Sequence, residues 1–368
     1  MFTEPEPTQN TPELPVEQDW LEKVLNESVK SQGKIQNINS VGISEGKGFL
    51  SVVSKITIEW DSESSEELGE EFSKLMDIDL VKKVHNREVF IYTLFNSHGE
   101  EPPFAMPRLY YCEEISDESD GILILQDLSK NTASTKFGDD FTLGQAECLA
   151  RNLASMQAYS LKYSDEWLHK LDNMGSDVYE QMTKEWDTYK DFLKENYPDV
   201  KFSDETFDKI RQTALSLLPM FTEPETTGYP LVLVYGDLQP NNLLWKTAEN
   251  DDVPLDEIAA MIDYQIVHRG VFFEDVTYLL CLYLKPSDRR QHGKRILKQF
   301  YERLEELLLP DKPPYSFQEL LDGYDKLLPF FVMMFMGFFK VFISVMKLED
   351  KIPQLGEHLN CLIEDVHV

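Results

Sequence analysis

The chain has 368 residues, 42% of them hydrophobic, and carries 35 Lys and Arg against 66 Asp and Glu, a formal net charge of −31. That length is too great for one simple core and fits two lobes at roughly 100–200 residues each. A surface this acidic repels nucleic acid and anionic lipid, which excludes both as default partners. The four cysteines show no CxxC spacing, as in reduced thiols of cytoplasmic proteins.

The chain begins with an acidic, proline-rich stretch, and we expect a disordered tail over residues 1–18 that is not a signal peptide. Helical spacing of apolar residues follows over 19–26. Gly46 and Gly48 then precede a run rich in Val, Ile and Thr over 51–60, which predicts a glycine-rich turn and a strand. Such a turn either covers phosphates with its backbone N–H groups or closes an ordinary hairpin.

Residues 61–84 have apolar side chains at helical spacing and no β-branched run, so a helix is predicted here rather than a strand. The helix is expected to continue over 85–95. Glu88 lies on it, where the simplest expectation is an exposed glutamate. Two strands are predicted next, over 107–112 and 121–129, separated by an acidic turn.

The second of these strands ends at Gln126 and Asp127, where we expect the chain to pass between lobes. The N-terminal, nucleotide-binding lobe would then comprise residues 19–127, and a helical C-terminal lobe residues 128–368. A long helix with Thr142 as its N-cap begins the second lobe, and further helices follow.

The most informative stretch is 231–245 (LVLVYGDLQPNNLLW), a buried strand, a loop carrying Asp237 and Asn242, and a second short strand. A further strand over 257–263 ends at Asp263. These three side chains are the oxygen-rich set that a magnesium-dependent phosphoryl transferase needs, with one carboxylate for the attacking hydroxyl and hard oxygens for the metal. The alternative is a hairpin whose turns carry Asp and Asn. The D-x4-N spacing between apolar strands favours the phosphoryl transferase.

Residues 270–368 are predicted to be helical, and 327–346 are almost wholly apolar over the length that a bilayer requires. A membrane span is the alternative to a buried helix here. Pro329, Lys340 and the lack of basic residues massed on one flank favour a buried C-terminal helix.

Residues 235–245 (YGDLQPNNLLW) resemble the H-G-D-L-W-x-N-N motif of choline-kinase-like and ecdysteroid-kinase-like proteins, relatives of the aminoglycoside phosphotransferases. Residues 262–270 (IDYQIVHRG), followed by Asp275, are similar to the I-D-[FW]-Q-x4-G-x4-D segment of that family. Three other segments resemble its glycine loop, αC-like helix and hinge: 46–51, 85–88 and 122–128. The resemblance implies the α+β, protein-kinase-like fold, with a small, mostly β N-lobe and a larger, mostly helical C-lobe.

The resemblance implies an ATP- and Mg²⁺-dependent phosphotransferase that acts on the hydroxyl group of a small molecule. Asp237 would be the catalytic base, and Asn242 and Asp263 would hold the metal. Asp275 would brace the catalytic loop.

The same resemblance implies a nucleotide site in the front half of the chain. Gly46 and Gly48 would lie over the phosphates, and Gln126 would lie in the hinge. Glu88 would pair with a phosphate-binding lysine.

The sequence departs from the family pattern in the strand that usually carries this lysine, because 61–84 is predicted to be helical. Lys55 either substitutes for it or is a surface lysine. Tyr235 stands where the family has histidine, and Gln126 and Gln239 replace an acidic residue and a tryptophan. The alternatives are therefore a catalytically impaired pseudokinase or binding protein, or a front half shortened by splicing or gene prediction. The sequence leaves the substrate and the oligomeric state open.

Overall fold

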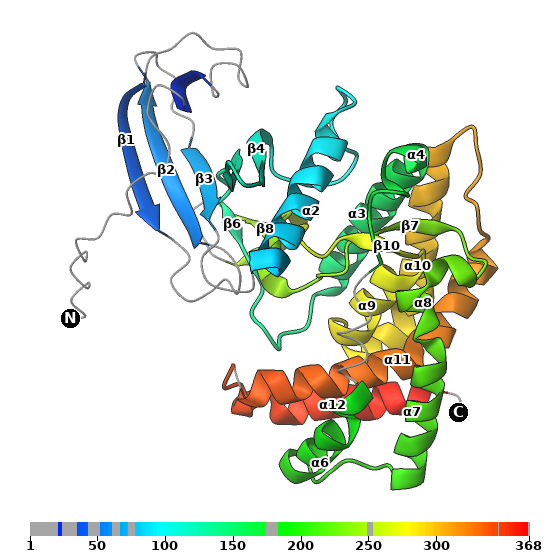
Figure 1. Ribbon diagram of the computed structural model, residues 1–368. Helices are drawn as coiled ribbons and strands as arrows, with labels where there is room; N and C mark the ends of the chain where they lie inside the picture. The colour runs from blue at the N-terminus through cyan, green and yellow to red at the C-terminus, as the bar shows by residue number, and fades with distance from the viewer. Residues whose placement is uncertain are drawn as a thin grey trace, which may run out of the picture. The chain divides into compact units, whose positions relative to one another are not determined.

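The computed structural model describes residues 21–23, 35–42, 52–60, 67–72, 78–173, 183–248, 253–344 and 346–366. Contacts divide the chain into two compact units (Figure 1), which are Met1–Gly99 with Pro107–Lys130 and Glu100–Met106 with Asn131–Val368. The predicted tail and the glycine-rich turn with Gly46 and Gly48 lie outside the described residues.

The first unit is built on a five-stranded antiparallel sheet with the order β1-β2-β3-β5-β4. Its strands are β1 (Ile35–Gly42), β2 (Val52–Trp60), β3 (Glu67–Phe72), β4 (Leu109–Ile115) and β5 (Asp120–Gln126). The strands predicted from the Val/Ile/Thr run and on either side of the acidic turn are confirmed as β2, β4 and β5.

The prediction of a helix throughout 61–84 is wrong in its first part. β3 is a strand in which Leu68 pairs with Ile56 of β2 on one side and with Gln126 of β5 on the other. The spacing of apolar residues within one segment cannot reveal hydrogen-bonded neighbours from elsewhere in the chain, and such pairing overrides local preference. The sheet therefore has a third strand, but its sequence, ELGEEF, contains no lysine.

Helix α2 (Ile78–Asn96) packs against β4 and β5. Asn86 fixes its position, because its side chain accepts from Ile115 N at 2.7 Å and donates to Ile115 O at 3.1 Å. Glu88 is 1% exposed, so the expectation of an exposed glutamate is wrong. Burying a carboxylate is costly unless it is paired, and Glu88 does interact with other groups.

The second unit contains a three-stranded sheet, β6-β8-β9, and a two-stranded ladder, β7-β10. Its strands are β6 (Thr132–Ala133), β7 (Leu231–Val234), β8 (Leu243–Thr247), β9 (Pro254–Met261) and β10 (His268–Val271). The predicted strand, loop and strand of 231–245 are confirmed as β7, the loop with the 3₁₀ turn η2 (Pro240–Asn242), and β8.

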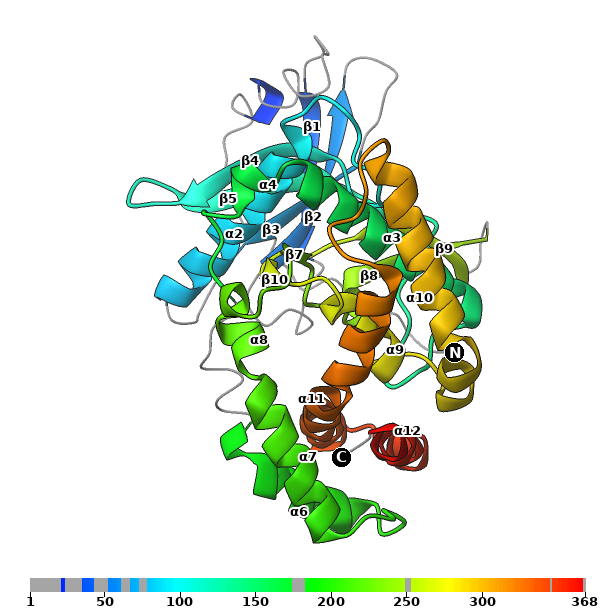
Figure 2. The same ribbon diagram turned by 90° about the vertical axis from the view of Figure 1, so that its right-hand side faces the viewer.

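Helices form most of the second unit (Figures 1 and 2). The α-helices are α3 (Leu143–Lys162), α4 (Ser164–Trp167), α6 (Trp186–Asn196), α7 (Asp204–Leu217), α8 (Pro219–Thr222), α9 (Glu274–Leu282), α10 (Pro286–Leu308), α11 (Phe317–Ser344) and α12 (Ile352–Asp365), with 3₁₀ turns η1 (Pro224–Thr226) and η3 (Glu349–Lys351). Thr142 caps α3 as predicted, since its side chain accepts from Gln145 N and the Gln145 side chain accepts from Thr142 N.

The apolar helix α11 packs against α6, α7, α9, α10 and α12. Among the described helices, it is the one long and apolar enough to cross a membrane, with a mean hydropathy of 2.0 over its most apolar window. Within the protein, however, 78% of that window is buried, which is the arrangement of a core helix.

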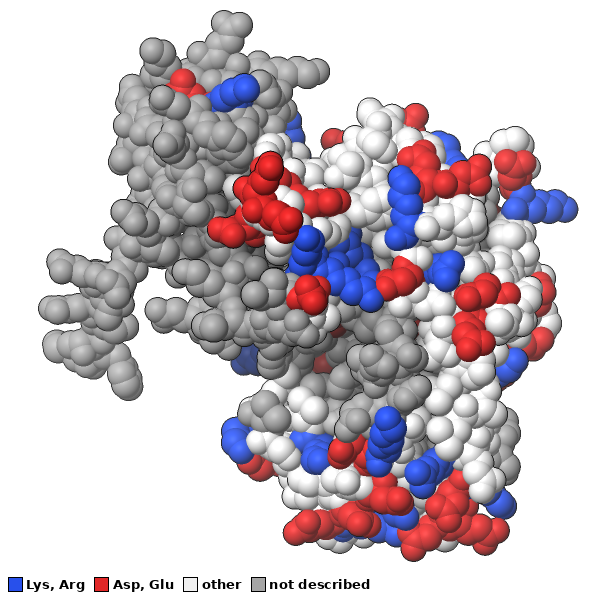
Figure 3. All heavy atoms as spheres, viewed as in Figure 1, with Lys and Arg blue, Asp and Glu red and all other residues white. Residues whose placement is uncertain are grey.

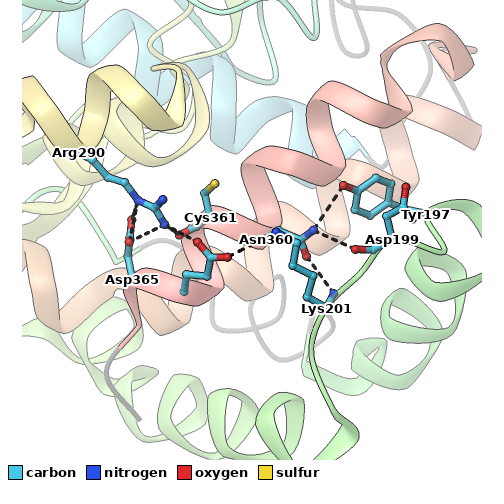
Figure 4. Close-up of polar contacts among 8 residues, drawn as sticks. Tyr197, Asp199, Lys201, Arg290, Asn360, Cys361 and Asp365 are labelled. Atoms are coloured by element: carbon cyan, nitrogen blue, oxygen red, sulfur yellow. Dashed lines mark hydrogen bonds and ion pairs between the residues drawn. The ribbon is translucent and has the colours of Figure 1, made fainter.

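Polar contacts fasten the C-terminal half of α12 on two sides (Figure 4). Asn360 donates to Tyr197 Oη at 3.4 Å and to Asp199 O at 3.2 Å, after the end of α6. On the other side, Arg290 of α10 donates to Asp365 at 3.0 Å and to Cys361 O at 3.0 Å. On the face shown in Figure 3, acidic and basic side chains are interspersed around these helices, at the bottom of the view.

Two buried helical glycines give a matched test of this packing. A Cβ at Gly356 of α12 would lie 2.6 Å from ring atoms of Tyr197, whereas a Cβ at Gly293 of α10 would meet its nearest neighbour at 3.9 Å. We expect Gly356→Ala to lower the free energy of unfolding by about 1–3 kcal/mol, because the ring must shift. Gly293→Ala should raise it by about 0.5–1 kcal/mol, because Ala favours a helix. Urea unfolding measures both, and equal effects would contradict the tight contact.

Candidate active site

The loop that carries Asp237 leaves a strand that is fixed in the core. β7 is the apolar run LVLV, whose last three residues are buried, and Tyr235 behind it is fully buried. Gly236 has φ +80°, a left-handed conformation that glycine adopts without strain. A Cβ there would also lie 3.1 Å from the His268 ring. The chain therefore turns sharply at Gly236 and presents Asp237 at the start of the loop.

Asp275, at the start of α9, holds this turn. Its two carboxylate oxygens accept from Tyr235 N at 2.7 Å and from Gly236 N at 2.9 Å. The brace that the family resemblance implied is therefore present. Burial raises the pKa of Asp275 to about 6, while the two N–H bonds and the neighbouring His268 oppose that rise. The site thus keeps a carboxylate in a desolvated place and offsets part of its cost with donors.

Tyr235 connects the loop with the segment that precedes Asp263. Its hydroxyl donates to Ile262 O, and its ring packs against Tyr264 at 5.5 Å between centroids. The phenol that replaces the family's histidine therefore still orders the backbone next to the expected metal ligand.

Asn242 and Asp263 lie just outside the paired ends of two neighbouring strands, β8 and β9. Leu243 pairs with Met261 in the β8-β9 ladder, and one step further Ile262 N donates to Asn242 O at 3.0 Å. The Asn242 side chain donates to Asp237 O at 3.3 Å, which ties the end of the loop to its beginning. The three residues singled out from the sequence therefore lie on one hydrogen-bonded framework.

Asp263 has φ +63°, a conformation that a residue other than glycine seldom adopts. Its carboxylate accepts from Gln265 N at 3.4 Å. Strained backbone of this kind is held by surrounding structure and is concentrated at functional sites. Here the surrounding structure includes the bonds of Ile262 to Asn242 and to Tyr235.

Asp237 itself is half-buried. Burial raises the pKa of its carboxyl group above the ordinary value, and hydrogen bonds from Gln239 and Asn242 oppose the rise. Burial and then the charge of Asp237 also raise the pKa of Tyr283, which places this phenol within electrostatic range of the carboxylate. The Tyr283 ring stacks on Phe141 at 4.9 Å.

The donor set fits magnesium better than a transition metal. In the part of the chain that the structure describes, no three or more His, Cys, Asp and Glu side chains gather as a metal site. Magnesium in phosphotransferases is held by one or two protein oxygens together with the substrate phosphates. Asn242 and Asp263 supply hard oxygens of this kind.

Two buried residues to which the sequence analysis gave no role, His268 and Glu274, lie next to the turn before Asp237. His268 and Glu274 are 1% and 5% exposed and are 3.1 Å apart, from Nε2 to Oε1. The signal in the sequence is a histidine and a glutamate that each follow apolar residues, Ile266 and Val267 before His268 and Phe272 and Phe273 before Glu274.

The residues expected at the nucleotide lie in the first unit. Glu88 is buried on α2, and Gln126 is exposed at the end of β5, where its side chain accepts from Arg108 N at 3.4 Å. The glycine pair lies outside the described residues.

Comparison with known proteins gives a family match over most of the chain. A family model with the description "Uncharacterized oxidoreductase dhs-27" (DUF1679) matches residues 64–368. The chain is 27% identical to the uncharacterized kinase-like protein D1044.1 of Caenorhabditis elegans over 257 residues, which are 67% of this chain and 63% of that protein. It is 23% identical to dhs-27 of the same nematode over 222 residues, 60% of this chain and 26% of dhs-27. The chain thus spans less than two thirds of either relative.

Among solved structures, the chain is similar to a Ralstonia eutropha protein provisionally assigned as an aminoglycoside phosphotransferase. The TM-score is 0.52 at 11% identity, over 95% of this chain and 98% of that chain. At this identity the likeness shows the fold alone. It confirms the expected α+β, protein-kinase-like class.

Removal of the Asp275 carboxylate should loosen the loop. We expect Asp275→Ala to lower the free energy of unfolding by about 2–4 kcal/mol, because two enclosed N–H groups lose their acceptor. Amide exchange at Tyr235 and Gly236 should accelerate in the same variant. The control is Asp208→Ala at an exposed site of α7, which should change stability by less than about 0.5 kcal/mol. Unchanged exchange at both amides would show that Asp275 does not brace the loop.

Proposed function

Because the chain belongs to the DUF1679 family, a group of choline-kinase-like and ecdysteroid-kinase-like proteins, we propose that it is an ATP-dependent phosphotransferase that acts on the hydroxyl group of a small molecule. The observation that carries this proposal is the framework around Asp237. Asp275 fixes the turn before it, and Asn242 bonds back to it from the end of the loop, where Ile262 N donates to Asn242 O.

In the proposed reaction the alcohol oxygen attacks the γ-phosphorus of ATP, the bond from that phosphorus to the β–γ bridging oxygen breaks, and ADP leaves. Asp237 orients the hydroxyl group and takes its proton. Burial raises the pKa of Asp237 and so makes its carboxylate a stronger proton acceptor than an exposed aspartate. The fixed turn at Gly236 keeps this carboxylate in one place, and such positioning is the main protein contribution to phosphoryl transfer.

Asn242 and Asp263 would hold Mg²⁺ at the end of this loop. When bound, the metal supplies positive charge that offsets the charge of the phosphates. The left-handed backbone at Asp263 supports this assignment, because the framework maintains a strained residue at that point.

A pseudokinase that binds nucleotide or a small molecule without transfer is the second candidate, and β3 favours it. The family carries its phosphate-binding lysine on the third strand, and β3 has none. In the strands of the five-stranded sheet as described, Lys55 of β2 is the one lysine, and its backbone pairs with Gly69 of β3. A transferase that drew its lysine from these described strands would therefore use Lys55.

Asp237→Asn separates chemistry from binding. We expect the wild-type protein to release ADP from Mg-ATP in the presence of at least one alcohol of a broad library, and the variant to lose this turnover by about 10²–10⁴-fold. Its melting temperature should stay at the wild-type value. Full activity of the variant would exclude Asp237 as the base.

The variant to compare with Asp237→Asn is Asp263→Asn. Because it removes a proposed magnesium ligand, it should reduce the stabilisation that Mg-ATP confers on the protein. Saturation at 100 times the dissociation constant adds about 2.7 kcal/mol to the free energy of unfolding of a protein that binds. Stabilisation by Mg-ATP without transfer to any alcohol would favour the pseudokinase, and the absence of both would overturn the proposed function.

A further inference from the structure

His268 is enclosed between two hydrogen-bond acceptors. Its Nδ1 lies 2.9 Å from Ile266 O, and its Nε2 lies 3.1 Å from Glu274 Oε1. A backbone carbonyl oxygen can only accept, so Nδ1 carries a proton. Nε2 faces Glu274 Oε1, so one more proton lies between these two atoms, and with that proton on Nε2 the ring is an imidazolium paired with Glu274.

The pair retains this proton because its loss would leave like charges together. Glu274 and Asp275 are neighbours in the first turn of α9 and, among the described residues, are the charged groups that act on His268. Burial alone lowers the pKa of His268, but the charge and bond of Glu274, the bond to Ile266 and the charge of Asp275 together raise it above the ordinary value. Without the proton, two enclosed carboxylates would have no cation beside them.

The imidazole ring lies directly against the turn before Asp237. A Cβ at Gly236 would lie 3.1 Å from His268 Cε1 and 3.2 Å from Nδ1. The β7-β10 ladder fixes this contact, because His268 pairs with Val234 two residues before Gly236. Gly270 closes the other side, since a Cβ there would lie 2.8 Å from Glu274 Oε2. Gly236 is thus held between the His268 ring and the Asp275 carboxylate, which accepts its N–H.

We propose that His268, as an imidazolium paired with Glu274, is a positioning residue for the loop that carries Asp237, and that loss of its proton loosens this loop. The proposal rests on the proposed function for its effect on turnover. It stands on the structure alone for its effect on the loop.

The direction of the pH dependence follows from the raised pKa of His268. Its contribution to stability is fully present below the unfolded-state pKa of about 6.5 and is lost as the pH rises through the higher folded-state value. Turnover should therefore fall on the alkaline side as His268 loses its proton. Removal of the Glu274 charge should lower the pKa of His268 and move this fall to lower pH.

The test compares His268→Gln and Glu274→Gln with the wild-type chain. NMR of the histidine ring nuclei follows the charge of His268, and amide exchange at Tyr235 and Gly236 follows the loop. Exchange, corrected for its intrinsic pH dependence, should rise as His268 titrates and should be fast at every pH in His268→Gln. In Glu274→Gln the rise should occur at lower pH.

The control is His358→Gln. His358 is also buried, at 5% exposure, and bonds to Asp140 at 2.8 Å, but it lies on α12. This variant removes the same kind of pair and should leave exchange at both loop amides unchanged.

With an alcohol substrate in hand, His268→Gln should lower kcat by about 10- to 100-fold with little change in KM, because a displaced base costs rate more than binding. The alkaline fall in kcat should move to lower pH in Glu274→Gln. The positioning proposal would be overturned if the amide exchange rates at Tyr235 and Gly236 did not change as His268 titrates, or if the His268 ring were neutral at pH 6. Either result would count even if the protein transfers phosphate. If the wild-type protein transferred phosphate to no alcohol, the proposed function would be refuted. The titration of the His268 ring and the amide exchange of the loop would still decide the proposal for His268.

Discussion

The two hydrogen bonds from Tyr235 N and Gly236 N to the Asp275 carboxylate are the contact on which the rest of the site depends. The chain must leave β7 and turn at once, so these N–H groups have no strand partner after Val234. Enclosed N–H groups need an acceptor, and a side chain from the first turn of α9 supplies it. Because α9 packs against α11, the position of Asp237 is set by the core of the helical unit rather than by the loop alone.

A tyrosine in place of the family's histidine changes how the loop is supported. Tyr235 reaches Ile262 O and so holds the backbone next to Asp263. A different histidine, His268, lies against Gly236 from β10. The support of the loop is thus shared by the Tyr235 phenol on the side of the expected metal ligands and the His268 ring on the side of α9. The proton on which we propose that this support depends is therefore held at His268, away from the expected metal ligands.

The candidate site could be predicted from the spacing of residues within one stretch of the chain. Part of the fold could not, because it depends on pairing between strands that are far apart in the sequence. Asp237, Asn242 and Asp263 could be chosen from the sequence because they lie next to short apolar strands, with the D-x4-N spacing and then a strand followed by Asp. The strand β3 could not be predicted from the sequence, because its own apolar residues are spaced as in a helix. Glu67–Phe72 forms a strand because it pairs with β2 and β5. His268 was missed for a similar reason. Its contact with Gly236 arises from the β7-β10 ladder, which brings together residues that the sequence keeps apart.

The first unit contains the residues on which the choice between a transferase and a pseudokinase depends, Glu88 and Lys55. Burial of a carboxylate costs free energy, and α2 nevertheless buries Glu88 to 1% exposure. Glu88 lies at the position where the family resemblance expects the partner of a lysine. β3 is present as the third strand of the sheet, and its described residues include no lysine. Lys55 is the one lysine on the described strands of this sheet, and it pairs in register with the strand that usually carries the family's lysine. A transferase that used Lys55 at the phosphates would have to pair it with Glu88, whereas a pseudokinase would require neither residue there.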